Sequence, residues 1–179
     1  MKLIEPNIEY EEQIRAYRKE FFDAGEPFNL HGTGPLRRIE DPKEWIECCK
    51  MYKNPETVPE GRVQATQFIY VRESDNKIVG MIQVRHCLNA YLEKYAGHIG
   101  YSVAPSERRK GYASQMLKLA LEKYKELGLK KVLITCTDTN EASRRTILKN
   151  GGVYESTVFE PDEKENLQRY WIDLERYGK

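Results

Sequence analysis

The sequence has little cysteine, and the spacing of its cysteines is not that of a metal site. Four cysteines in 179 residues form no Cys-x-x-Cys pair, whereas zinc sites and disulfide frameworks use regularly spaced cysteines. An excess of one charge is missing too, because 29 lysines and arginines accompany 28 aspartates and glutamates. This balance argues against a surface that binds nucleic acid or a membrane over a wide area.

Long hydrophobic runs are also missing. No stretch reaches the roughly 20 apolar residues that span a bilayer, and the first residues include Glu5 instead of an apolar run. Hydrophobic residues make up 40% and charged residues 32% of the chain, as is usual for a globular protein. We therefore expect a cytoplasmic protein with a single domain over residues 1–179, no signal peptide and no metal.

Hydrophobic periodicity predicts an alternation of helices and strands. Helices are expected over 10–24, from Asp41-Pro42 to about residue 52, over 111–127 and over 141–149; strands over 2–5, 67–73, 77–86, 97–103, 131–137, 153–159 and 167–174. Alternation along 77–86 predicts one face with Ile78, Ile82 and Val84, and an opposite face with Val79, Met81, Gln83 and Arg85. The order of elements predicts an α/β fold in which helices flank a mixed, mostly antiparallel sheet of about six to seven strands.

A basic, glycine-containing loop between a strand and a helix is the most informative segment. Three consecutive cations, Arg108 to Lys110, precede Gly111 and the small residue Ala113. Glycine lets a backbone approach a ligand closely while it turns into a helix. The N–H groups at the positive end of that helix can hold a phosphate or pyrophosphate. The two best-known phosphate loops, G-x-x-x-x-G-K-[ST] and G-x-G-x-x-G, do not occur here.

The context of this loop resembles the GNAT superfamily of acyl-CoA-dependent N-acetyltransferases. The strand Ile99-Gly-Tyr-Ser-Val-Ala-Pro105 leads into Arg108-x-x-Gly111-x-Ala113, an amphipathic helix, a buried strand, Asn140-Glu-Ala-Ser143 and Lys149-Asn-Gly151. The resemblance is specific over residues 97–152. It implies a GNAT fold with splayed central strands, a cofactor-binding core over 67–174 and a variable acceptor-side part over 1–66. The implied co-substrate is acetyl-CoA.

Site residues follow from the resemblance, position by position. Ser102 and Val103 are expected to contact the pantetheine arm and the acyl carbonyl, with the Val103 N–H as an oxyanion donor. Asn140 is expected to approach the pantetheine, although an N-cap role explains it equally well. The pyrophosphate is expected on the loop residues Arg108, Arg109, Lys110, Gly111, Tyr112, Ala113 and Ser114.

Two positions depart from the family pattern. Ile147 stands where the family often has a tyrosine that protonates the leaving thiolate, and Gly152 stands where an aromatic residue is usual. The general acid is then water, Tyr154 or Tyr170. Alternatively, the thiolate leaves without strong assistance, because the reference pKa of a thiol is only about 8.5.

The proton of the acceptor amine needs a base. His98 lies early on the splayed strand, where the family often has a glutamate, and an unperturbed imidazole titrates near pH 6.5. We expect His98 to be this base. A structural histidine is the alternative, and Arg85 and His86 on the neighbouring strand are alternatives for lining the acceptor pocket.

Three functions are consistent with these residues. The first is direct transfer of an acetyl group from acetyl-CoA to a small-molecule or peptide amine, without a covalent enzyme intermediate. The second is an acyl-CoA-binding sensor without turnover. The third, nucleic-acid binding by Arg108 to Lys110, is disfavoured because the following helix carries Glu122 and Glu126 and no aromatic platform. We expect no nucleic-acid or membrane partner; the acceptor and the oligomeric state, including a homodimer, stay open.

Overall fold

A computed structural model describes residues 1–177, and its elements agree closely with those expected from periodicity. The strands are β1 (Lys2–Ile4), β2 (Ala65–Arg72), β3 (Lys77–Arg85), β4 (Ile99–Val103), β5 (Lys131–Thr137), β6 (Val153–Glu160) and β7 (Glu165–Asp173). The α-helices are α1 (Glu11–Asp23), α2 (Pro42–Lys53), α3 (Tyr112–Glu126) and α4 (Glu141–Lys149). Shorter helical turns are η1 (Ile8–Tyr10), η2 (Pro27–Asn29), η3 (Gly34–Arg37), η4 (Leu92–Ala96) and η5 (Pro105–Glu107).

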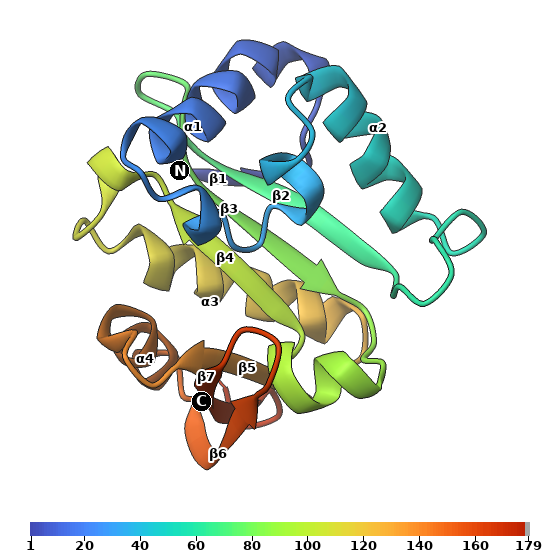
Figure 1. Cartoon of the computed structure of the whole chain (residues 1–179), viewed down its shortest axis with the longest axis vertical. Coiled ribbons are helices and arrows are strands. Elements are labelled where there is room, and N and C mark those ends of the chain that lie inside the picture. Colours follow the sequence, from blue (N-terminus) through green and yellow to red (C-terminus); the bar gives the residue numbers. More distant parts are fainter. Residues whose placement is uncertain (178–179) are drawn as a thin grey trace.

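The strands form two antiparallel sheets that separate between β4 and β5. One sheet has the order β1-β2-β3-β4 and the other the order β5-β7-β6. They meet at a bridge between Gly97 and Ile134, where the His98 N–H donates to the Leu133 carbonyl over 2.8 Å. Figure 1 shows the four-stranded sheet above the smaller one. The predicted α/β fold with splayed central strands is therefore confirmed.

Side-chain caps begin two of the helices where the sequence predicts them. The Asp41 side chain accepts from the Lys43 N–H, with Pro42 in the first turn of α2. The Asn140 side chain accepts from the Ser143 N–H over 3.0 Å and begins α4. Each cap satisfies a backbone donor that the helix leaves unpaired, so these boundaries are set locally.

Two hydrophobic cores cover opposite faces of the four-stranded sheet. Helices α1 and α2 pack on one face and α3 on the other, and Figure 1 shows α1 in front of the sheet and α3 behind it. The largest fully buried side chains of the α1–α2 core are Ile14, Phe21, Leu36, Trp45, Ile69, Ile78 and Met81. The α3 core includes Tyr70, Ile82, Met116, Leu117 and Tyr124 and continues onto the smaller sheet.

A β-bulge corrects the predicted faces of β3. Tyr70 pairs with Gly80 while Val71 pairs with Ile78, so Val79 has no partner on β2. The extra residue reverses the alternation on one side of the bulge. As a result Ile78 lies in the α1–α2 core with Met81, and Val79 lies in the α3 core with Ile82 and Val84.

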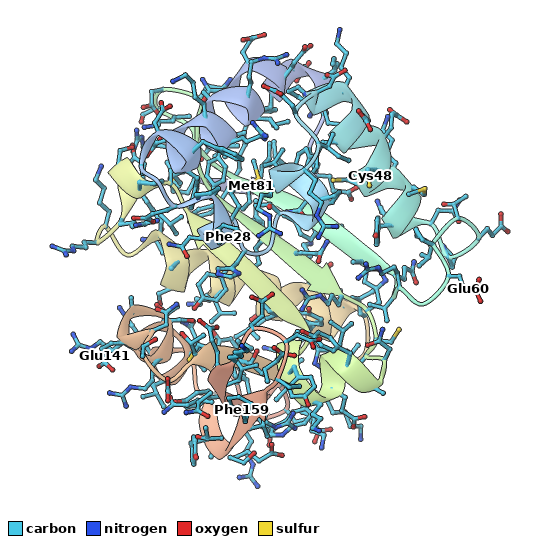
Figure 2. The ribbon with its side chains drawn as sticks, in the orientation of Figure 1. Phe28, Cys48, Glu60, Met81, Glu141 and Phe159 are labelled. Carbon is cyan, nitrogen blue, oxygen red and sulfur yellow. The ribbon has the colours of Figure 1, made fainter. Side chains whose placement is uncertain are left out.

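The segment after α1 passes over the middle of the sheet. The predicted loop from Gly25 to Pro35 contains η2 and the start of η3, and it lies in front of β3 and β4 in Figure 1. Figure 2 shows Phe28 of this segment in front of the same strands. Within residues 1–177, no helix is long and apolar enough to cross a membrane.

Candidate active site

The outer edge of β4 exposes backbone groups to the gap between the two sheets. Just before and just after β4, the Arg85 N–H donates to the His98 carbonyl and the Ala104 N–H donates to the Val79 carbonyl, each over 3.0 Å, so this carbonyl and this N–H face β3. Backbone groups alternate in direction along an antiparallel strand. The N–H and C=O groups of Tyr101 and Val103 therefore point away from β3, toward the gap.

Ser102 does not contribute to this edge. It forms the hydrogen-bonded pair with Met81 that the alternation requires, so its backbone faces β3. Its hydroxyl lies 3.1 Å from the buried Tyr17 hydroxyl of α1. The expectation for Ser102 is thus corrected: its polar groups bind within the fold, and Tyr101 and Val103 carry the open edge.

A run of unpaired backbone donors follows β4. Within residues 1–177, no protein oxygen accepts from the N–H groups of the six residues from Arg109 to Ser114. Arg109 has φ 62 and Gly111 has φ 81, the left-handed conformation that turns neighbouring amides toward one side. Since α3 begins at Tyr112, the positive end of its dipole adds to these donors. The loop is built to receive an anion.

Two of the three loop cations are already paired with carboxylates. Arg108 contacts Glu26, at 2.5 Å for the shorter pair of atoms, and lowers the pKa of that carboxyl. Lys110 lies 2.8 Å from the buried Glu107. Within the described part of the chain, Arg109 is the one loop cation without an ion pair. The backbone amides, more than the cations, are therefore the anion-binding groups here, and the basic run is a weak candidate for nucleic acid.

Glu107 anchors the loop from beneath. Its carboxylate accepts from Arg72, Lys77 and Lys110, at 2.8 Å in each case. The Arg72 guanidinium, followed by the two lysines, holds the pKa of Glu107 far below its usual range. A carboxyl with a lowered pKa contributes stability that is fully present above its unfolded-state pKa of about 4.3 and is lost as the pH falls below that value.

Glu107→Gln is therefore expected to lower the free energy of unfolding by about 2 kcal/mol at pH 7. This is less than for a fully buried pair, because the lysine partners are partly exposed. Urea denaturation at pH 7 and at pH 3.5 tests this expectation. The difference between the two proteins should shrink at the lower pH, and an equal loss at both values would assign the effect to shape instead of charge.

His98 is enclosed in the core instead of facing an acceptor. Its side chain is 7% exposed, its Nδ1 accepts from the Leu133 N–H over 3.0 Å, and its ring packs on Tyr124 and Trp171. Burial lowers the pKa of the imidazole to about 4. A neutral ring that accepts at Nδ1 carries its proton on Nε2, so no lone pair is free to act as a base. His98 joins the two sheets, and the base must be sought elsewhere.

Arg85 and His86 are also bonded within the fold. Arg85 donates to the carbonyls of Ala96 and Gly97, at the end of η4. The His86 Nε2 lies 2.8 Å from the Thr66 hydroxyl. Both side chains hold segments around β3, and neither is directed by these bonds toward the gap.

The segment after α1 touches β4 backbone to backbone. A Cβ on Gly32, whose φ is 67, would lie 1.9 Å from the Gly100 carbonyl oxygen. The Gly32 carbonyl accepts from the Gln67 amide over 2.8 Å, which holds the contact in place. Only residues without side chains can meet this closely. The contact fixes the preceding residue, His31, beside the middle of β4.

His31 is a titratable group that the sequence did not single out. Burial lowers the pKa of its imidazole, and the nearby Arg37 lowers it further, while Glu165 of β7 raises it. The His31 residue is exposed to solvent. A ring that is neutral at pH 7, on the α1 side of β4, can accept a proton there.

A tyrosine hydroxyl from β4 lies near the α4 face that carries Ile147. Ile147 is fully buried in the α3 core, and Gly152 is required beside it because a Cβ there would lie 2.4 Å from its side chain. The Tyr101 hydroxyl lies 2.8 Å from the Ser143 hydroxyl, one helical turn before Ile147 on the same face of α4. Burial raises the pKa of Tyr101 to about 12, so the phenol stays protonated.

Tyr154 and Tyr170, the two tyrosines named as possible acids, bond to their own strands. The Tyr154 hydroxyl lies 2.9 Å from that of Thr157, and the Tyr170 hydroxyl donates to the Gln168 side chain over 2.6 Å. Asn140 is exposed and caps α4. Within residues 1–177, no cluster of side chains is suited to hold a metal ion.

The sequence predicted the loop and did not point to His31 or Tyr101, which lie on either side of β4. Arg109, Lys110, Gly111, Tyr112, Ala113 and Ser114 do form one donor-rich turn, and Val103 lies on the adjoining edge. His31 and Tyr101 were missed because each depends on a long-range contact. The Gly32-x-Gly34 spacing beside His31 was the one signal of a tight backbone approach.

Comparison with known proteins agrees with this geometry. The family model described as "Acetyltransferase (GNAT) family" matches residues 12–151. Among proteins with curated functions, none matches this sequence. The ribosomal-protein-S5-alanine acetyltransferase from Vibrio fischeri superimposes with a TM-score of 0.73 at 16% identity, over 99% of this chain and 94% of that one.

Two further structures share the fold at low identity. RimJ from Mycobacterium smegmatis, in complex with CoA-disulfide, has a TM-score of 0.72 and 18% identity, over 99% of this chain and 83% of that one. A mutant of the spermidine N-acetyltransferase SpeG from Vibrio cholerae has a TM-score of 0.66 and 14% identity, over 100% and 98% of the two chains. With a family match over most of its length, an exposed β4 edge and a donor-rich loop before α3, this chain belongs to the GNAT family of acetyltransferases.

Proposed function

We propose that this protein transfers an acetyl group from acetyl-CoA directly to the amine of a small molecule or peptide. The observation that carries the proposal is the run of six unpaired N–H groups from Arg109 to Ser114, next to the open edge of β4. A pyrophosphate needs several convergent donors, and a pantetheine arm carries amides that can pair with a strand edge. Both needs are met by backbone groups of adjacent segments.

Cofactor binding, oxyanion stabilisation and proton donation are carried out by different groups around β4. Acetyl-CoA supplies the acetyl group as an activated thioester. The amides of the loop hold the pyrophosphate, and the Val103 N–H donates to the acyl oxygen as negative charge develops on it. One such donor typically contributes about 10²- to 10³-fold to the rate. As the bond between the acetyl carbon and the sulfur of coenzyme A breaks, the Tyr101 hydroxyl, aligned by Ser143, donates a proton to the leaving thiolate.

His31 replaces His98 as the proposed base. An amine with a lysine-like pKa of about 10.4 is mostly protonated at pH 7, so it must lose a proton before it attacks. His31 follows Leu30, which is buried in the α1–α2 core, whereas Tyr101 packs against the α3 core on the other face of β4. The lowered pKa of His31 keeps most of its rings neutral at pH 7. This placement puts the proton acceptor and the proton donor on opposite faces of the strand.

Ligand binding and turnover test the proposal separately. Acetyl-CoA should raise the melting temperature, because a ligand that binds only the folded state stabilises it. Release of free thiol should then depend on the added amine in a panel of amino acids, aliphatic amines and lysine peptides. No stabilisation at millimolar acetyl-CoA would refute the cofactor assignment. Stabilisation without thiol release from any amine would identify an acyl-CoA sensor instead.

His31→Ala is expected to lower kcat by about 10²-fold, as loss of a general base commonly does. Since only the neutral ring accepts a proton and burial lowers its pKa below 6.5, the wild-type rate should fall to half of its plateau value at a pH below 6.5. A pH profile of kcat measures this limb, which should disappear in the variant. Added imidazole should restore part of the rate. If the variant keeps the full rate and an unchanged fall in rate at low pH, water and not His31 accepts the proton of the amine.

A further inference from the structure

A stacked arginine without an anionic partner lies on the segment between α1 and α2. The Arg37 guanidinium lies over the Phe28 ring, with its central carbon 4.6 Å from the ring centroid. Within residues 1–177, no carboxylate forms an ion pair with Arg37, and no protein oxygen accepts a hydrogen bond from its side chain. Stacking uses the face of a guanidinium and leaves the N–H donors at its edge available. The Arg37 guanidinium is therefore held in place while its donors stay unused.

The charges around this stack are also uncompensated. Arg18 of α1 donates to the carbonyls of Leu36 and Arg37, over 3.0 Å and 3.3 Å, and forms no ion pair within the described residues. Glu26 is the one acid in the sequence from 25 to 39, and it is already paired with Arg108 at 2.5 Å. This part of the surface is therefore positive, and it favours a ligand that carries negative charge.

Two contacts place Phe28 beside β4. Glu26 contacts Arg108 just beyond the end of β4, and Gly32 meets Gly100 within the strand. Phe28 lies between these anchors, and two residues of chain keep it within about 7 Å of Glu26. Figure 2 shows Phe28 in front of β3 and β4. Since Phe28 is 72% exposed, a ligand can reach the stack from solvent.

Arg37 comes from the face of the sheet that is opposite to the cofactor helix. Leu36 is buried in the α1–α2 core, whereas α3, which follows the donor-rich loop, packs on the other face. A Cβ on Gly34, at the start of η3, would lie 3.3 Å from the Gln83 amide nitrogen. Gln83 pairs with Gly100 of β4. The turn that carries Arg37 therefore begins over the first half of β4, and the donor-rich loop follows the other end of the strand.

We propose that Arg37 binds a carboxylate of the acceptor, so that the preferred acceptor is an amino carboxylate instead of a diamine. A carboxylate is planar and matches two parallel N–H donors of a guanidinium. Phe28 is a positioning residue that holds this guanidinium. The proposal rests on acetyl transfer as the function of the neighbouring site. Amines without an acidic group lack the contact, and the second ammonium of a diamine is repelled by Arg18 and Arg37.

Binding is measured first, because it does not depend on acetyl transfer. The protein is titrated calorimetrically at low salt with the twenty common amino acids, both alone and with coenzyme A, which has no acetyl group to transfer. At least one amino acid should bind saturably, and the matching amine without the carboxylate should bind at least about 10-fold more weakly. Absence of binding by every amino acid would refute the proposal, as would equal affinity for the matching amine.

Arg37→Gln removes the charge and should weaken the amino acid that binds at least about 10-fold. Arg38→Gln is the matched control, because it removes the same charge from the exposed neighbouring residue, and it should change affinity less than about 2-fold. Arg37→Lys should restore only part of the affinity, since an ammonium lacks the guanidinium fork. Phe28→Leu should weaken binding as well. Equal losses in Arg37→Gln and Arg38→Gln would assign the effect to net charge and contradict the subsite.

Kinetics then separates the subsite from the reaction. With the amino acid that binds as acceptor, Arg37→Gln should raise KM at least about 10-fold and lower kcat much less, because the contact is present in ground and transition states alike. Loss of acetyl-CoA affinity with an equal acceptor KM would place Arg37 at the cofactor and refute the proposal. Binding that depends on Arg37 without thiol release would keep the subsite and refute the proposed function. Acetylation that does not depend on Arg37 would keep the function and refute the subsite.

Discussion

Gly111→Val is expected to weaken acetyl-CoA binding at least about 100-fold. Gly111 has φ 81, a conformation that a β-branched residue adopts only at high cost, so the loop must rearrange. The space beside its Cα is empty of protein, with the nearest atom, the Gln115 amide nitrogen, 4.0 Å from an ideal Cβ. Loss of two charge-assisted hydrogen bonds, each worth about 1.5–3 kcal/mol, already exceeds 100-fold. Titration calorimetry with acetyl-CoA measures the change.

Gly128→Val provides the matched control for this experiment. Gly128 ends α3 with φ 77 and has no atom within 4 Å of an ideal Cβ, so the substitution introduces similar backbone strain away from the loop. We expect both variants to lose similar stability and only Gly111→Val to lose acetyl-CoA. Retained affinity in Gly111→Val, or an equal loss in both variants, would contradict the assignment of the loop.

Gly32→Ala is expected to reduce acetyl transfer by about 10²-fold while acetyl-CoA still binds. The added Cβ would lie 1.9 Å from the Gly100 carbonyl oxygen, so the segment must move away from β4. A displacement of about 1 Å of a group that positions reactants costs on the order of 10²-fold in rate. Because the loop before α3 is not involved, stabilisation by acetyl-CoA should persist. Steady-state kinetics and thermal denaturation measure the two effects.

Gly25→Ala distinguishes a clash from backbone strain. Gly25 lies in the same segment with φ 72, and no atom lies within 4 Å of an ideal Cβ. We expect it to lose some stability and to keep most of its activity. If Gly25→Ala inactivates the enzyme as strongly as Gly32→Ala, the contact with Gly100 is not what positions the acceptor side.

The elements and the loop could be predicted because each is encoded in neighbouring residues. Asp41 and Asn140 cap α2 and α4 with their own side chains, and period-two alternation marks the strands. The same alternation predicts the wrong faces for Ile78 and Val79, because a bulge depends on the partner strand and not on the sequence of β3 alone. Local signals therefore located the segments but not every face.

The candidate site could be predicted only in part, for a related reason. The donors from Arg109 to Ser114 come from one continuous turn, so their chemistry follows from the order of residues. The structural position of His98 does not follow from the order of residues, since only the packed structure shows its Nδ1 bonded to the Leu133 N–H. The Tyr101–Ser143 contact joins residues 42 positions apart.

The sequence by itself determined the family, the elements and the anion-binding loop, because periodicity, caps and a glycine-containing turn act within a few residues. Tertiary structure alone decided which polar groups are free. Packing occupied His98 and Ser102, paired Arg108 and Lys110 with carboxylates, and left the N–H groups from Arg109 to Ser114 without an acceptor in the described part of the chain. Long-range contacts determine how buried a group is and which partners it has. These contacts, more than residue type, decide which side chains are available for chemistry.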